Sequence, residues 1–137
     1  MKFYESGDNR KPVIFLFPGT CCQYSSFDHV LDGLHSYFYT VAVSYDGFDP
    51  NEKTEFYSME DECEKIEQEI RTKYGGRIKA AYGCSLGGSF VSLLIQRKRI
   101  HIDHGIIGSS DMDEAGNLVA KIPVSYTHLT LPTICSV

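Results

Sequence analysis

The segment 83–87 reads Gly-Cys-Ser-Leu-Gly and places Ser85 between two glycines. A short apolar run precedes it and apolar residues at helical spacing follow it, so the pattern predicts a strand that turns directly into a helix at Ser85. Strand and helix pass this closely only where Gly83 and Gly87 carry no side chain. Ser85 would then be a nucleophile exposed above the sheet edge, with the Leu86 N–H facing a developing oxyanion.

Two alternatives concern the same motif. One is a glycine-rich turn with an inert serine, but the strand before it and the helix after it favour the functional interpretation. The other is a thiol nucleophile at Cys84, which instead occupies the variable position of the motif and is expected to be a small packed residue. Cys21 and Cys22 are adjacent in sequence and give only a weak hint of redox chemistry.

Strands and helices alternate along the chain. Strands are predicted at Val13–Phe17, Tyr39–Ser44, the apolar run that ends at Gly83, and 102–108. Parallel strands joined by helices form a mostly parallel, doubly wound α/β sheet with flanking helices, and the sites of such sheets lie at the carboxyl ends of the strands. This organisation places Ser85 at such an end.

Helix boundaries are signalled by capping residues. Ser25 or Ser26 is the predicted N-cap of the helix after the first strand. Ser58 opens the next helix with Asp61 three residues later, and Gly75 ends it. The Glu and Lys residues of this second helix are expected to form a solvated face.

The loop 17–20, Phe-Pro-Gly-Thr, and the strand-to-helix turn at Ser85 (the elbow) resemble the α/β-hydrolase family, and the resemblance covers nearly the whole of residues 1–123. The resemblance implies a partial α/β-hydrolase fold. It also implies that the Thr20 N–H joins Leu86 in an oxyanion hole, while Gly19 permits close approach to the substrate. The implied reaction is acyl transfer to water through a serine ester.

A serine nucleophile needs a histidine base and an orienting carboxylate, which follow it in this family in the order acid, then histidine. Asp111 is a possible acid at a strand end, and the acidic residues around it lack the ligand spacing of an EF-hand, so no metal is predicted. His128 follows in the right order but falls within residues 124–137, which are not expected to be native. His101 and His104 lie before or inside a strand and are expected to have structural roles.

The tail 124–137 is the second unusual feature. Residues 124–133 resemble, over ten consecutive residues, a translated transposase sequencing adapter, and 134–137 fit its continuation and stop. We therefore expect residues 1–123 to be the N-terminal part of an α/β-hydrolase domain, and residues 124–137 to be adapter-derived. The acid and base would then be lost by truncation, which predicts an inactive or very weak fragment of an active parent.

The composition of the chain argues against several classes of partner. A net charge of −5 and a pI near 5.5 argue against nucleic-acid binding, and neither a membrane span nor a signal peptide is predicted, so we expect a cytoplasmic protein. No phosphate or dinucleotide motif follows the first strand, so no cofactor is expected. The predicted function is hydrolysis of a small-molecule, ester-like substrate. The alternatives are an acyltransferase or thioesterase on the same fold, or a non-catalytic binding protein.

Overall fold

A computed structural model describes residues 1–108 of the 137. Asp111, His128 and the tail 124–137 lie outside the described residues, and the predictions made for them stay predictions. The strands are β1 (Lys2–Ser6), β2 (Val13–Phe17), β3 (Tyr39–Ser44), β4 (Arg77–Cys84) and β5 (His101–Gly108). The helices are a 3₁₀ turn (Tyr24–Phe27), α1 (Asp28–His35), α2 (Met59–Tyr74) and α3 (Leu86–Arg97).

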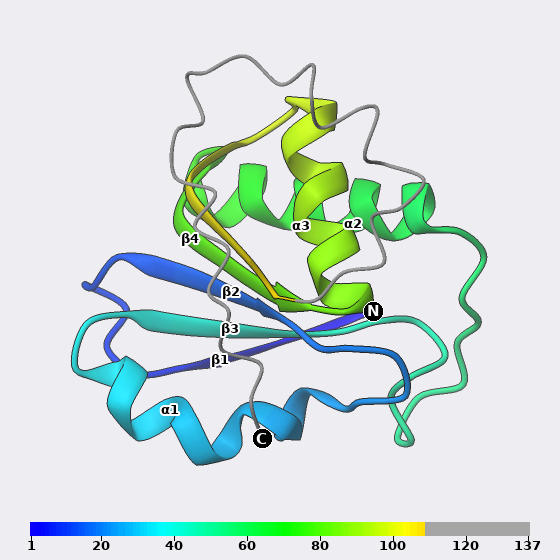
Figure 1. Cartoon of the computed structure of the whole chain (residues 1–137), viewed down its shortest axis with the longest axis horizontal. Helices are drawn as coiled ribbons and strands as arrows, with labels where there is room; N and C mark the ends of the chain where they lie inside the picture. Colours follow the sequence, from blue (N-terminus) through cyan, green and yellow to red (C-terminus); the bar gives the residue numbers. More distant parts are fainter. Residues whose placement is uncertain (109–137) are drawn as a thin grey trace.

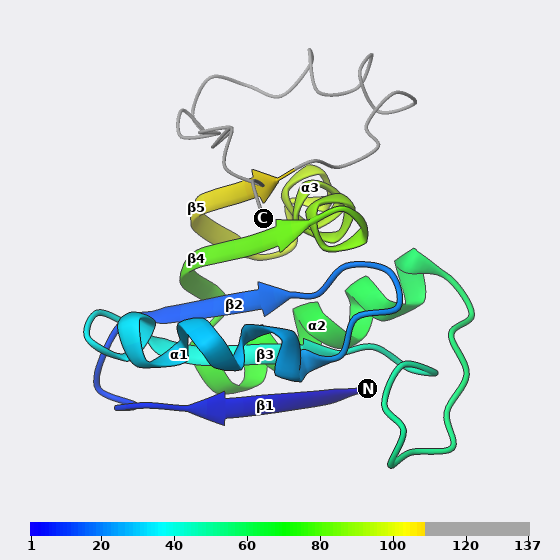
Figure 2. The same cartoon turned by 60° about the horizontal axis from the view of Figure 1, so that its bottom comes forward.

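The strands form one sheet in the order β1-β3-β2-β4-β5. Strands β2 to β5 run parallel, as predicted, and Figure 2 shows their arrowheads pointing the same way. β1 was not predicted and pairs antiparallel with β3, from Lys2 opposite Ser44 to Ser6 opposite Thr40. None of its residues is fully buried, so its apolar pattern is weak and its pairing with β3 defines it.

Helices cover both faces of the sheet. α2 and α3 lie on one face and α1 on the other (Figure 1). Phe15 and Phe17 of β2 point into the larger core beneath α2 and α3, while Ile14 and Leu16 join a smaller core beside α1. Burial on both faces explains why this strand is a continuous apolar run.

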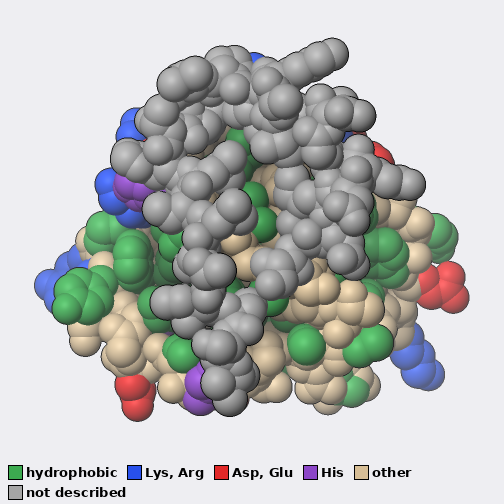
Figure 3. All heavy atoms as spheres, in the orientation of Figure 1, with side chains coloured by type: hydrophobic (Ala, Val, Ile, Leu, Met, Phe, Trp, Pro, Cys, Tyr) green, Lys and Arg blue, Asp and Glu red, His purple; other side chains and the backbone are tan. Residues whose placement is uncertain are grey.

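Charged side chains lie mostly around the rim of the face seen in Figure 3. Within residues 1–108, no helix combines the length and apolar character needed to cross a bilayer.

The cap predictions for α2 are confirmed. The Ser58 Oγ accepts a hydrogen bond from the Asp61 N–H at 3.1 Å, and Gly75 ends the helix in the left-handed conformation, with φ of 65°. The predicted solvated face is wrong at two positions, because Glu62 and Glu67 are fully buried. Both carboxylates have cationic partners, which makes their burial tolerable.

The predicted start of α1 is wrong. Neither Ser25 nor Ser26 is an N-cap, because both lie inside the 3₁₀ turn, which runs directly into α1 without a side-chain capping bond. The Tyr24 ring stacks on Tyr4 of β1, with ring centroids 3.5 Å apart. This contact between distant segments fixes the chain one or two residues before the predicted cap.

Candidate active site

Ser85 lies at the junction of β4 and α3 in a strained conformation. Its φ of 54° and ψ of −123° are sparsely populated by residues with a side chain. The backbone holds the turn on both sides: the Ser85 N–H donates to the Gly108 carbonyl at 3.0 Å, and its own carbonyl accepts from the Ser89 N–H at 3.1 Å. The side chain is exposed and makes no capping bond to α3. The sharp strand-to-helix turn expected at Ser85 is therefore present.

Both elbow glycines lie against backbone. A Cβ added to Gly83 would stand 2.1 Å from the Gly87 carbonyl oxygen. One added to Gly87 would stand 2.0 Å from the Phe17 oxygen and 3.0 Å from the Pro18 oxygen. Because backbone atoms cannot rotate away as a side chain can, any residue larger than glycine would push β2, β4 and α3 apart. The sequence Gly-x-Ser-x-Gly thus follows from how closely these three elements pack.

The loop after β2 lies beside the elbow. Gly19 is so close that an added Cβ would stand 3.7 Å from the Ser85 Cβ and 3.4 Å from the Cys84 oxygen. The Cys22 N–H donates to the Gly19 carbonyl at 3.1 Å and closes a turn. Thr20 and Ser85 line one pocket of about 270 Å³. The loop and the serine are therefore at the same sheet edge, as the resemblance requires.

Tyr45 is a residue that sequence reasoning missed. It follows β3 and is fully buried, and its hydroxyl donates to the Pro18 carbonyl at 3.0 Å. Burial raises the pKa of this hydroxyl, with smaller contributions from the charges of Cys63 and Glu62, so it stays protonated and remains a donor. Its signal in the sequence is a tyrosine directly after a buried strand, at the edge where the sites of such sheets lie.

His101 and His104 lie too far along β5 to reach Ser85. Gly108 pairs with Cys84, the residue before the serine, whereas His101 stands seven residues earlier on β5 and His104 four. At about 3.3 Å per residue, these positions are roughly 23 and 13 Å from the sheet edge. Their register agrees with the structural roles expected for them.

A second pocket adjoins the one that Thr20 and Ser85 line. It has a volume of about 420 Å³ and an almost wholly apolar wall, which includes Val30 and Leu34 of α1. Ser26, Phe27 and Tyr82 line both pockets, so the space beside Ser85 leads into an apolar groove between α1 and the sheet.

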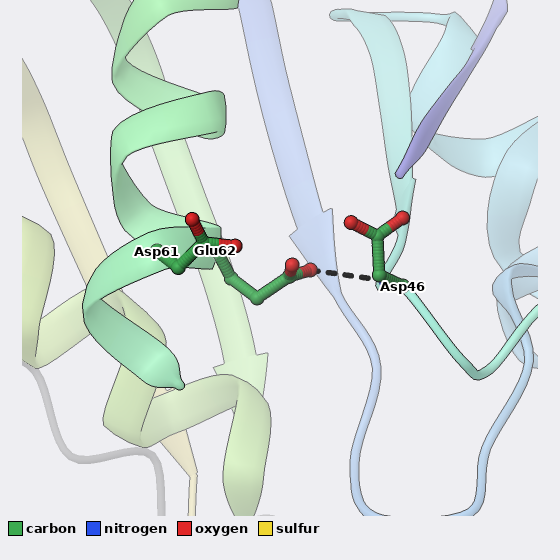
Figure 4. Close-up of side chains that lie close together, drawn as sticks. All are labelled: Asp46, Asp61 and Glu62. Atoms are coloured by element: carbon green, nitrogen blue, oxygen red, sulfur yellow. Dashed lines mark hydrogen bonds between the residues drawn. The ribbon is translucent and has the colours of Figure 1, made fainter. Parts of the chain in front are cut away.

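A carboxylate cluster stands apart from this site. Asp46 follows β3, while Asp61 and Glu62 lie on the first turn of α2, and their oxygens approach within 4.8 Å of one another (Figure 4). Such a cluster could hold a cation, but the Lys65 ammonium already contacts all three carboxylates, at 2.5 to 2.9 Å. The amine of Met1 pairs with Asp46 as well. Cationic groups of the protein thus compensate the charge, and the cluster joins β3 to α2.

Comparisons with known proteins support the fold. No family model and no curated protein matches the sequence. Among solved structures, an α/β-hydrolase family protein from Desulfitobacterium hafniense superposes with a TM-score of 0.75 at 18% identity, over 83% of this chain and 48% of its own. A hydrolase from Pseudomonas aeruginosa PA01 superposes with a TM-score of 0.70 at 18% identity, over 91% of this chain and 51% of its own. The enol-lactonase from Burkholderia xenovorans LB400 superposes with a TM-score of 0.70 at 18% identity, over 80% of this chain and 43% of its own.

This chain has a partial α/β-hydrolase fold and spans about half the length of the solved structures that it matches. At such low identity the comparisons show the fold alone. The role of each site residue has to be argued from the chemistry of the site.

Proposed function

We propose that this chain is the N-terminal part of a cytoplasmic serine hydrolase that acts on small carboxylic esters, with Ser85 as its nucleophile. The observation that carries the proposal is an exposed serine in a strained strand-to-helix turn, packed against the Gly19 loop. Strain of this kind persists where the surrounding structure enforces it and is concentrated at functional sites. Membership of the fold supports the same chemistry, since Ser85 stands where the fold presents a nucleophile.

The proposed reaction has two steps. The Ser85 hydroxyl loses its proton to a base and attacks the ester carbonyl, and the resulting tetrahedral oxyanion accepts hydrogen bonds from the Thr20 and Leu86 N–H groups. The carbon–oxygen bond to the alcohol then breaks, the base returns the proton to the alcohol, and a serine ester remains. Water attacks this ester in the same way and releases the carboxylic acid. The apolar groove beside Ser85 suits the hydrocarbon part of an acyl group.

The base, and the acid unless it is Asp111, are proposed to lie beyond this chain. No histidine on β5 reaches Ser85, and the matching structures are about twice as long. With residues 124–137 interpreted as adapter-derived, the natural sequence after residue 123 would supply the histidine. Asp111 stays a candidate for the acid. A transferase or thioesterase would share all of these features and differ only in the acceptor or the leaving group.

Labelling with a fluorophosphonate probe tests this proposal. The probe is applied to the 137-residue chain and to the longer product of the uninterrupted gene, each with Ser85→Ala and Ser26→Ala variants. Ser26 is a matched control because it lines the same pocket as Ser85. We expect fast labelling of the longer protein that Ser85→Ala abolishes and Ser26→Ala preserves, accompanied by ester turnover.

The 137-residue chain should react far more slowly, since enzymes that lose triad members keep a rate enhancement of only about 10³ to 10⁴ over the reaction in water. A longer protein that the probe does not label at Ser85 would favour a non-catalytic binding protein. Equal turnover by the short and long proteins would disprove the truncation.

A further inference from the structure

The Tyr45 side chain is held rigidly at the interface between β3 and α3. Its ring stacks on Phe90 of α3, with centroids 4.5 Å apart and planes 19° from parallel, and meets the Phe48 ring edge-on at 5.5 Å. The side chain is fully buried. The packed ring holds the hydroxyl beside the Pro18 carbonyl, to which it donates at 3.0 Å.

The Pro18 carbonyl lies between Tyr45 and the elbow. Its oxygen would be only 3.0 Å from a Cβ on Gly87, so the first turn of α3 covers it on the other side. Pro18 is buried, and a buried carbonyl without a hydrogen-bond donor is costly. The Tyr45 hydroxyl thus supplies a partner for an oxygen that has little contact with water.

This bond also sets the direction of the next amide. No described peptide is cis, so the Pro18 carbonyl and the Gly19 N–H point in opposite directions across a planar bond. With the carbonyl held toward Tyr45, the Gly19 N–H must face away from the core. Gly19 itself packs against Ser85. The orientation of this peptide therefore helps to set the path of the backbone from Gly19 to Thr20, on which the direction of the Thr20 N–H depends.

We propose that Tyr45 is a positioning residue. Its hydroxyl holds the Pro18–Gly19 peptide in the orientation in which the loop after β2 directs the Thr20 N–H toward the oxyanion. Its catalytic consequence rests on the proposed function of Ser85. Without the hydroxyl, the Pro18 carbonyl loses the hydrogen bond that favours its inward orientation, and the peptide rotates between orientations. The Thr20 N–H then spends less time where the oxyanion forms.

The direct test is Tyr45→Phe in the 137-residue chain, which keeps the ring and removes the hydroxyl. The matched control is Tyr74→Phe. Tyr74 also packs edge-on against a core ring, that of Phe15, but its hydroxyl donates to Glu5, at 2.6 Å. Amide resonances of Gly19 and Thr20 are measured by NMR. We expect both resonances to shift and broaden in Tyr45→Phe only. Unchanged Gly19 and Thr20 amides in Tyr45→Phe would overturn the proposal.

A kinetic test separates positioning from stability. In the longer gene product, Tyr45→Phe should lower kcat for an activated ester about tenfold with little change in KM, because the loop contributes mainly to the transition state. Tyr74→Phe should leave both values unchanged. A raised KM with unchanged kcat would contradict the positioning role. If the ester turnover does not depend on Ser85, the proposed function fails while the NMR result still decides whether Tyr45 fixes the peptide.

Discussion

Two regions of the molecule are built in different ways. The elbow region, residues 17–22 and 83–88, is held by backbone against backbone: glycines without room for a Cβ and hydrogen bonds between main-chain atoms. The α2 charge network is held by side chains and consists of two separate groups of ion pairs, one of Asp46, Glu62 and Lys65 and one of Glu67 and Arg97. Its buried carboxylates have cationic partners, whereas the elbow presents an exposed hydroxyl.

The difference identifies which polar groups are available for chemistry. In the network, Glu67 accepts from Arg97 at 2.6 Å, and this hydrogen bond raises the pKa of the guanidinium. Glu62 accepts from the Asp46 N–H at 3.0 Å and pairs with Lys65. The charges of the Glu62 and Glu67 carboxylates are therefore compensated by contacts within the fold. Ser85 contributes strain instead of stability, which supports the proposal that it acts as a nucleophile.

The largest expected effect is steric and lies in the elbow. Gly87→Ala would place a Cβ 2.0 Å from the Phe17 oxygen and should cost at least about 3 kcal/mol in the free energy of unfolding. The matched control is Gly33→Ala in α1, where nothing lies within 4 Å of the added Cβ, and which should stabilise by about 0.4 to 1 kcal/mol. Urea unfolding measures both. A Gly87→Ala variant as stable as the wild type would mean that the elbow is looser than described.

The next effect lies in the network. Glu67→Ala leaves the Arg97 guanidinium, itself only 14% exposed, without its main partner, and should cost roughly 2 to 4 kcal/mol. Glu64→Ala removes another contact of Arg97, at 3.4 Å, but from a side chain that is 61% exposed, and should cost less than about 0.5 kcal/mol. Equal losses in the two variants, measured by thermal unfolding, would show that burial does not decide the contribution of these pairs.

A smaller effect measures the strain at Ser85. Glycine accepts a positive φ without steric cost, so Ser85→Gly should stabilise the chain by about 1 kcal/mol. Ser85→Ala keeps a Cβ and should stay within about 0.5 kcal/mol of the wild type. Denaturant midpoints of the two variants give the comparison. If they coincide, the serine is not strained and the contrast between the two regions loses its basis.

The smallest effect concerns a carboxylate whose partner is neutral. The Tyr4 hydroxyl donates to Asp49 at 2.6 Å and, with the Asn51 backbone N–H, holds the pKa of Asp49 below its ordinary value. A lowered pKa in the folded state means that this stabilisation is present above about pH 4 and is lost as the pH falls through the folded pKa. Tyr4→Phe should therefore flatten the fall in Tm between about pH 5 and pH 2, as circular dichroism would show. An identical pH profile would exclude this linkage.

Local patterns in the sequence determined most of the parallel sheet and the elbow. Val13–Phe17 and Tyr39–Ser44 have the predicted bounds, and the first of them is a continuous apolar run because β2 is buried on both faces. Ser58 and Gly75 mark the ends of α2, because their capping interactions lie within a few residues of chain. The turn at Ser85 was predictable for the same reason: two glycines at fixed spacing carry its steric requirement.

Only the tertiary structure decided what depends on distant partners. β1 exists through its pairing with β3, the 3₁₀ turn before α1 is fixed by the stacking of Tyr24 on Tyr4, and Glu67 is buried because Arg97 of another helix meets it. The role proposed for Tyr45 depends on a carbonyl 27 residues away in sequence. No periodicity or cap encodes such contacts, since their free energy arises only when separate elements pack together.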